Sequence, residues 1–236
     1  MEESLRGLLL KRVAYGEADL ILTFLSRERG LVSCFGRSAR RQKRAWSGLL
    51  SPGNTLEIEL STRRQTGLPT LKHLRLGKDR SQKLATPATL ARAAYYLDLA
   101  IRVTVEGAPA SDFLDRLELA LDHIEEPGVS RFMEWASVDQ LGVLPPLDHC
   151  GECGAEFGDS GGRLAPGGGG MFCLACGGQG QRVAGQTLHH LRALSQGQWR
   201  MENEAERDLA KLLGQILFHQ LGVLESRRQA ARYAAL

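Results

Sequence analysis

The sequence lacks the segments that carry a chain into or across a membrane. No apolar run approaches the roughly 18 residues that are needed to span a bilayer. The start of the chain, Met1 to Ser4, carries two acidic side chains and resembles neither the basic nor the apolar part of a signal peptide. These absences predict a cytoplasmic protein with no membrane association.

The sequence also lacks the short motifs that accompany common catalytic sites. It has no GxxxxGK[ST] or GxGxxG loop for nucleotide phosphates, no HExxH helix and no GxSxG turn. Glu57 and Glu59 alternate with apolar residues, as the solvent face of a half-buried strand would. Four further carboxylates have no evident partner: Asp98, Asp112, Asp115 and Glu118. We therefore expect no enzymatic turnover.

The composition is that of a globular chain whose charge is unevenly distributed. The 236 residues are 43% hydrophobic and 24% charged, enough for one large domain or two modest ones with a buried core. Residues 1–80 hold 16 Lys/Arg against 8 Asp/Glu, a net charge of +8, whereas residues 81–236 have a net charge of −5. This asymmetry indicates a basic module for a polyanion and a second module for packing or protein partners.

The first 80 residues predict a small β-barrel. A turn at Arg27 to Gly30 separates two apolar runs, a pattern typical of a hairpin. We expect five strands near residues 8–13, 20–25, 31–36, 56–60 and 70–76. Five short strands in about 75 residues are consistent with a barrel of the oligonucleotide-binding (OB) type.

From Thr86-Pro87 onward the periodicity becomes helical. Threonine as N-cap with proline at the first helical position is a good helix start. A later long helix starts at Asn203, with Glu206 as a capping-box partner, and residues 225–236 form a tail. We expect an α+β multidomain protein with an OB-type barrel at 1–80, an all-helical domain at 81–236, and a four-cysteine zinc module inserted at 147–180.

Four cysteines form two CxxC pairs separated by nineteen residues: Cys150, Cys153, Cys173 and Cys176. In a reducing cytosol this pattern favours a metal over disulfides, and four thiolates suit one closed, structural Zn²⁺ per chain. Iron in a rubredoxin-like site is the chemical alternative. His149 could substitute as a ligand, although we expect it outside the ligand set. Cys34, in an apolar run, is expected to be a small buried hydrophobe.

A basic segment, residues 37–44, follows the predicted hairpin. Its five cations are Arg37, Arg40, Arg41, Lys43 and Arg44, with no acidic residue among them. Such a segment can follow a phosphate backbone, and Trp46 or Phe35 could stack on an unpaired base. Arg63 and Arg64, between the last two strands, could widen this surface. The alternatives are a solvated loop and a core position for Trp46.

Several stretches of this sequence together resemble the RecO family of DNA repair and recombination mediators. They are Gly16 to Thr23, Arg29-Gly30-Leu31, Gly36 to Arg41, and the stretch from Pro145 to Gly154 that leads into the first cysteine pair. The resemblance extends over nearly the whole chain. Because not every member keeps the cysteines, the metal site is inferred from the cysteines themselves.

The resemblance implies a function that the spacing of residues does not. It implies binding to single- and double-stranded DNA in DNA damage repair at the nucleoid, annealing of complementary strands, and loading of RecA together with RecR. In some members RecF and single-strand-binding protein also take part. The competing interpretation is a zinc-ribbon scaffold in transcription or RNA handling. A third, a metal-dependent hydrolase, needs an open coordination position.

Overall fold

The computed structural model describes residues 2–41, 46, 48–61 and 67–234. Across these residues no helix combines the length and the hydropathy of a membrane-spanning segment. The chain divides into two compact units, one formed by Met1–Asp122 with Ser226–Leu236 and the other by His123–Glu225. The domain boundaries expected at residue 80 and around residues 147–180 stay predictions.

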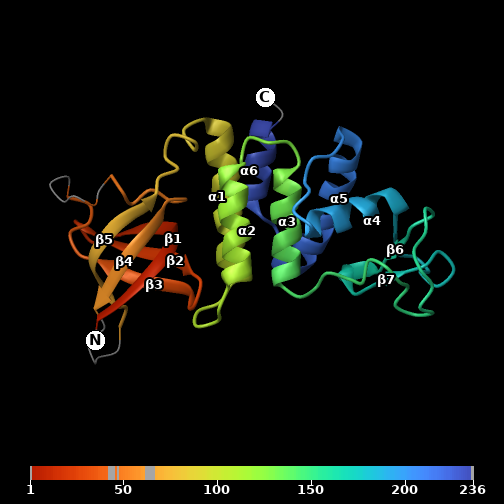
Figure 1. Cartoon of the computed structure of the whole chain (residues 1–236), viewed down its shortest axis with the longest axis horizontal. Coiled ribbons are helices and arrows are strands. Elements are labelled where there is room, and N and C mark those ends of the chain that lie inside the picture. The colour runs from red at the N-terminus through yellow and green to blue at the C-terminus, as the bar shows by residue number, and fades with distance from the viewer. Residues whose placement is uncertain (1, 42–45, 47, 62–66, 235–236) are drawn as a thin grey trace. The chain divides into compact units, whose positions relative to one another are not determined.

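The first unit begins with a closed five-stranded barrel (Figure 1). Its strands are β1 (Glu2–Tyr15), β2 (Asp19–Ser26), β3 (Gly30–Gly36), β4 (Thr55–Ser61) and β5 (Thr70–Lys78). Their order is β1-β2-β3-β5-β4, and β4 also pairs with β1 to close the barrel. The β3–β5 pair is parallel and the other pairs are antiparallel. The predicted OB-type barrel is therefore confirmed.

Strand β1 closes the barrel because it is long enough to pair on both sides. Its first half pairs with β4 and its second half with β2, and its register with β2 shifts between Leu9 and Lys11. A bulge of this kind bends a strand and increases its twist. A single strand can thereby serve both neighbours.

Alternating side chains of the strands fill the barrel. Along β2, Leu20, Leu22 and Phe24 are buried, and the residues between them are half-buried. Cys34 lies fully buried in the same core, and burial raises the pKa of its thiol to about 12. It is a small buried hydrophobe, as expected.

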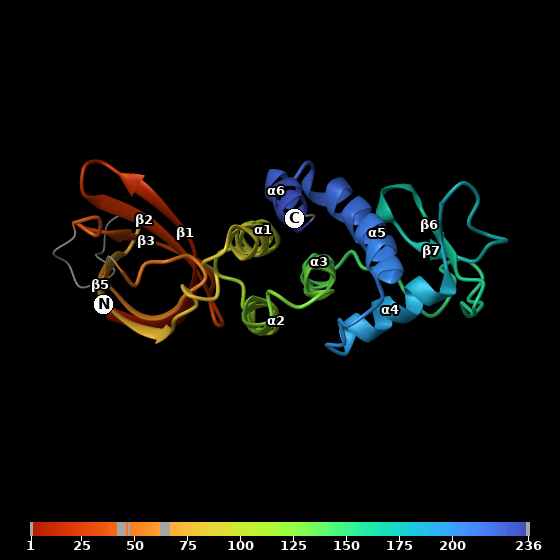
Figure 2. The same cartoon turned by 90° about the horizontal axis from the view of Figure 1, so that it is seen from above.

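Three helices complete the first unit: α1 (Pro87–Val103), α2 (Ser111–Asp122) and α6 (Glu225–Ala234). The start of α1 is confirmed, because the Thr86 hydroxyl accepts the Thr89 N–H at 3.1 Å and the Thr89 hydroxyl accepts the Thr86 N–H at 3.2 Å. Figure 2 shows α1 and α2 side by side. The expected tail is instead helix α6, fastened by a 2.6 Å hydrogen bond from Ser226 to Asp98.

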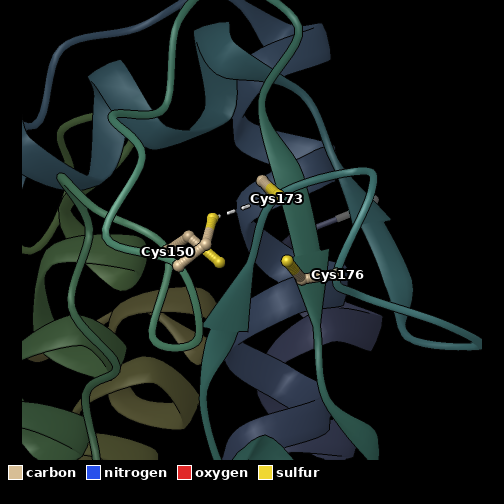
Figure 3. Close-up of side chains that lie close together, drawn as sticks. Cys150, Cys173 and Cys176 are labelled. Atoms are coloured by element: carbon tan, nitrogen blue, oxygen red, sulfur yellow. Dashed lines mark hydrogen bonds between the residues drawn. The ribbon is translucent and has the colours of Figure 1, made fainter.

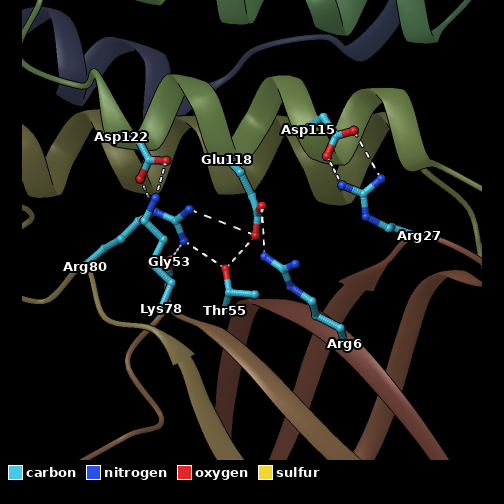
Figure 4. Close-up of polar contacts among 9 residues, drawn as sticks. All are labelled: Arg6, Arg27, Gly53, Thr55, Lys78, Arg80, Asp115, Glu118 and Asp122. Atoms are coloured by element: carbon cyan, nitrogen blue, oxygen red, sulfur yellow. Dashed lines mark hydrogen bonds and ion pairs between the residues drawn. The ribbon is translucent and has the colours of Figure 1, made fainter.

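The acidic face of α2 fastens this helix to the barrel (Figure 4). Asp115, Glu118 and Asp122 share one face because they recur at intervals of three and four. Their partners lie on or just beyond the strands: Arg27 for Asp115, Arg6 and Thr55 for Glu118, and Lys78 and Arg80 for Asp122. The sequence suggested no partner for Asp98, Asp115 and Glu118, which was wrong. The partners of Asp115 and Glu118 are 63 to 112 positions away in the chain, whereas Asp98 pairs at 3.1 Å with Arg102, only four positions away.

The second unit contains helices and a small sheet. Its elements are α3 (Val129–Gln140), β6 (Gly162–Leu164), the 3-10 turn η1 (Pro166–Gly168), β7 (Met171–Phe172), β8 (Gln181–Val183), α4 (Gly185–Ser195) and α5 (Asn203–Leu221). The strands pair in the order β7-β6-β8. The glycine-rich stretch between the cysteine pairs therefore contains regular structure.

The capping box expected at the start of α5 is wrong. The N-cap residue is Glu202, and no side chain caps the helix. Asn203 is already the first residue inside the helix. Its side chain therefore stands one position too late to accept the first free N–H groups.

Candidate metal centre and nucleic-acid interface

The two cysteine pairs lie in tight turns beside the small sheet (Figure 3). In the first turn the Gly154 N–H donates to the Cys150 carbonyl at 3.0 Å, and in the second the Gly177 N–H donates to the Cys173 carbonyl at 2.8 Å. The Gly151 N–H donates to the Met171 carbonyl at 2.9 Å, which ties the first turn to β7. Backbone hydrogen bonds thus bring together two pairs that are distant in sequence.

The glycine that follows each pair has a separate structural reason. Gly154 has φ of +71°, a left-handed conformation that is strained for residues with a Cβ. At Gly177 a Cβ atom would lie 2.7 Å from the Cβ of Arg163 on β6. The first glycine permits the turn, and the second permits the turn to pack against the sheet.

The four sulfur atoms have the spacing of a metal site. All four lie within 4.8 Å of one another, and the Sγ atoms of Cys153 and Cys173 are 3.8 Å apart. Zn–S bonds of about 2.3 Å put the sulfurs of a tetrahedral site about 3.8 Å apart. The thiols form no disulfide among the described residues. These four cysteines could therefore hold a metal ion, with no ligand position left over.

Local hydrogen bonds already favour thiolates at the first cysteine of each pair. Backbone N–H groups, led by that of Cys153, lower the pKa of the Cys150 thiol to about 6 despite its burial. The Cys176 backbone in the same way lowers the pKa of Cys173. The hydrogen bonds of Cys176 to Cys173 and Cys153 raise the pKa of its thiol to about 12. A bound cation would relieve this crowding of negative charge.

The described part of the basic segment, residues 37–41, lies against the loop between β1 and β2. The Arg40 N–H donates to the Ala18 carbonyl at 2.9 Å, and its guanidinium donates to the Gly16 carbonyl at 3.3 Å. The Asp19 carboxylate accepts the Ser38 N–H at 2.6 Å. Ser38 has φ of +51°, so this bond supports a turn that serine rarely adopts. The sequence did not reveal Asp19 as the partner of Ser38, because the two residues are 19 positions apart.

The other expected nucleic-acid contacts are placed only in part. Arg37, Arg40 and Arg41 are exposed, whereas Trp46 is half-buried and packs against the barrel core. Four of the expected residues lie outside the described part of the chain: Lys43, Arg44, Arg63 and Arg64. Contact of all eight residues with nucleic acid stays a prediction.

Glu57 and Glu59 project from the outer face of β4, opposite Arg75 and His73 of β5. Glu57 is exposed and pairs with Arg75 at 3.8 Å. A salt-bridged surface carboxylate of this kind is an ordinary feature of the solvent face of a strand. The interpretation of these two residues as surface positions is consistent with this placement.

Fold and site together define a class of protein that joins an OB-type barrel to helices and a four-cysteine centre. Two family models match this chain: Recombination protein O N terminal over residues 1–78, and Recombination protein O C terminal over residues 84–228. The chain therefore belongs to the RecO family of DNA repair proteins.

Curated relatives agree with this assignment. The DNA repair protein RecO of Anaeromyxobacter sp. (strain K) is 31% identical over 97% of this chain and 93% of its own length. The protein of the same name from Rubrobacter xylanophilus is 32% identical over 72% of this chain and 70% of its own length. That of Pelobacter propionicus is 28% identical over 96% of each chain.

Proposed function

We propose that this protein binds single- and double-stranded DNA and anneals complementary strands during recombinational repair. The observation that carries this proposal is that residues 37–41 of the basic segment are hydrogen-bonded onto the β1–β2 turn of an OB-type barrel in a RecO family member. OB folds bind oligonucleotides with their β2–β3 face and the neighbouring loops. The protein acts in the cytoplasm, at the nucleoid.

Annealing requires the basic segment to hold phosphates weakly. Arg37, Arg40 and Arg41, together with Lys43 and Arg44, screen the repulsion between two phosphate backbones and leave the bases free to pair. We propose the same contact role for Trp46, Arg63 and Arg64. Annealing in this way needs no nucleotide hydrolysis, because thermal energy is enough for a strand to leave one weak phosphate contact and form another.

We further propose that annealing is one part of a mediator role. The protein works with RecR, and with RecF and single-strand-binding protein where these are present, to load RecA onto coated single strands. The basis is membership of the RecO family. A direct check is co-elution of the purified chain with purified RecR on a gel-filtration column.

The four-cysteine cluster would hold one Zn²⁺ in a structural role. Cys150, Cys153, Cys173 and Cys176 would occupy all four positions of a tetrahedral ion, so no position is open for water. A bound Zn²⁺ would supply folding free energy to the turns around it. The residues of the centre position the chain and take no part in a reaction.

The test follows duplex formation from complementary oligonucleotides with and without the protein. Acceleration is expected at low to moderate salt, falling above roughly 0.2 M, where the Debye length drops below about 7 Å. Added ATP should change nothing. If annealing is not accelerated at any salt, or needs ATP hydrolysis by this chain, the mediator proposal fails. The scaffold role in transcription or RNA handling would then be the better interpretation.

A further inference from the structure

An apolar row crosses three strands on the outside of the barrel. Val13 of β1 is in register with Ile21 of β2, and Ile21 is in register with Phe35 of β3. Their neighbours Leu22 and Cys34 point inward and are fully buried, so Ile21 and Phe35 project outward because side chains alternate along a strand. Val13 is 43% exposed. Three adjoining strands thus present apolar side chains to solvent on one face.

Tyr15 continues this row at the end of β1. Its side chain is 55% exposed, more than the other aromatic side chains of the described barrel residues. Its ring meets that of Phe35 edge-on, with centroids 5.4 Å apart and planes at 81°. The backbone of Phe35 is anchored, because its N–H donates to the Pro69 carbonyl at 2.8 Å. The exposed ring of Tyr15 therefore packs against a side chain that projects from a hydrogen-bonded strand.

Residues 37–41 of the basic segment are attached next to this aromatic pair. Tyr15 is directly followed by Gly16, whose carbonyl accepts the Arg40 guanidinium, and it is in register with Asp19, which holds Ser38. An exposed aromatic ring and a cationic loop therefore share the β1–β2 turn. Trp46 packs against the barrel core, whereas Tyr15 is open to solvent. Tyr15 is therefore an aromatic side chain that is both near the cations and exposed.

We propose that Tyr15, held by Phe35, is the position on which an unpaired base of single-stranded DNA stacks. This inference rests on the proposed function and adds the group that selects single strands. The phosphates of any DNA attract the cations of the basic segment. A base can stack on Tyr15, however, only if it is not already stacked between the neighbouring bases of a duplex. The apolar row from Val13 to Phe35 excludes water beneath the base.

The test compares three probes of equal length, about 20 nucleotides, which exceeds the usual site of one OB fold. They are a thymidine oligonucleotide, an abasic oligonucleotide with the same phosphates, and a duplex. Tyr15→Leu should weaken binding of the thymidine probe about 5- to 100-fold and leave the abasic probe and the duplex unchanged. Tyr15→Phe should bind all three like the wild type, because it keeps the ring.

The salt dependence provides a second readout. Tyr15→Leu should leave the slope of log affinity against log salt unchanged, because it removes no phosphate contact. Tyr233→Ala is a matched control, since Tyr233 is also exposed, at 43%, and lies on α6 outside the barrel. It should bind all three probes like the wild type. Thermal melting of each variant checks that the barrel remains folded.

The outcomes separate this inference from the proposed function. If the wild type binds the thymidine probe and Tyr15→Leu binds it equally well, the stacking proposal is overturned while DNA binding stands, and the apolar row is then a candidate surface for a protein partner. Equal loss of the thymidine and abasic probes would also overturn it, because the loss would then be structural. If the wild type binds no probe, the proposed function and this inference fall together.

Discussion

We expect Arg80→Ala to destabilise the barrel unit more than any other single truncation in the contact between α2 and the barrel. The Arg80 side chain is only 1% exposed. Its Nε donates to Asp122 at 2.8 Å, and its Nη1 donates to the Gly53 carbonyl at 3.0 Å and to Thr55 at 2.9 Å (Figure 4). Glu118 lies 4.0 Å from Nη2. One guanidinium therefore donates hydrogen bonds to three acceptor groups and lies at ion-pair distance from a fourth.

The expected loss of unfolding free energy is about 3 kcal/mol. Removing one partner of a buried ion pair costs about 3–5 kcal/mol, because the remaining charge stays buried without compensation. The lower end applies here, since the Asp122 side chain is 25% exposed and keeps Lys78 at 2.6 Å. Lys78 itself is 49% exposed, so Lys78→Ala should cost at most about 1 kcal/mol.

The assay is urea unfolding followed by circular dichroism, with hydrogen exchange to localise the effect. Exchange should speed up in β4 and α2, which Arg80 joins, and less in α3 and α5 of the other unit. Arg80→Lys is the informative control. It keeps the charge but loses the planar fork, so it should recover only part of the lost stability.

A loss for Arg80→Ala no larger than that for Lys78→Ala would refute this reasoning. It would mean that the arginine is not the buried centre of the contact. A double-mutant cycle between Arg80 and Asp122 measures the pair directly, with an expected coupling of about 1–3 kcal/mol. Additive effects of the two substitutions would also refute the reasoning, because they would show that Arg80 and Asp122 are not coupled.

Three further predictions concern the metal centre, the basic segment and pH. Purified protein should contain one metal equivalent, bound through sulfur by X-ray absorption, and the serine double variant of Cys150 and Cys153 should contain none while retaining most DNA binding. Replacing Arg40 and Arg41 together with alanine should weaken binding to all DNA sequences alike and reduce the salt slope by about one to two units. Burial raises the pKa of Asp122, but its arginine and lysine partners outweigh this effect and lower it. The stabilisation from this carboxylate is therefore complete above its unfolded pKa of about 3.9 and lost as the pH falls through the lower folded value, so the gap between wild type and Asp122→Asn should close in acid.

The corresponding controls are specific to each case. Arg75, whose side chain is 86% exposed on β5, is a matched cation outside the basic segment, and Arg75→Ala should leave affinity and salt slope near those of the wild type. If Arg75→Ala and the double substitution of Arg40 and Arg41 lose equal DNA affinity, binding depends on general surface charge and not on the basic segment. Protein with free thiols and no metal would contradict the metal prediction. A stability gap that persists unchanged to pH 2 would contradict the role of the Asp122 charge.

Features that depend on neighbours in sequence were predictable from the sequence. The strands follow from alternation, and the start of α1 follows from Thr86 and Pro87, because caps and alternation involve residues only one to four positions apart. Each CxxC turn was predictable for the same reason, whereas the meeting of the two pairs within 4.8 Å depends on the pairing of the first turn with β7. Even local rules failed at Asn203, where the helix starts one residue earlier than its cap pattern indicates.

Tertiary structure alone decided which distant groups meet. Asp115 pairs with Arg27 across 88 positions, and Arg80 reaches Asp122 across 42. Asp19 holds Ser38, and Tyr15 meets Phe35, because the barrel brings the strand ends together. The physical reason is that the type of a charged or aromatic residue does not specify its partner. A carboxylate can pair with any cation within reach, and closure of the barrel determines which cation that is.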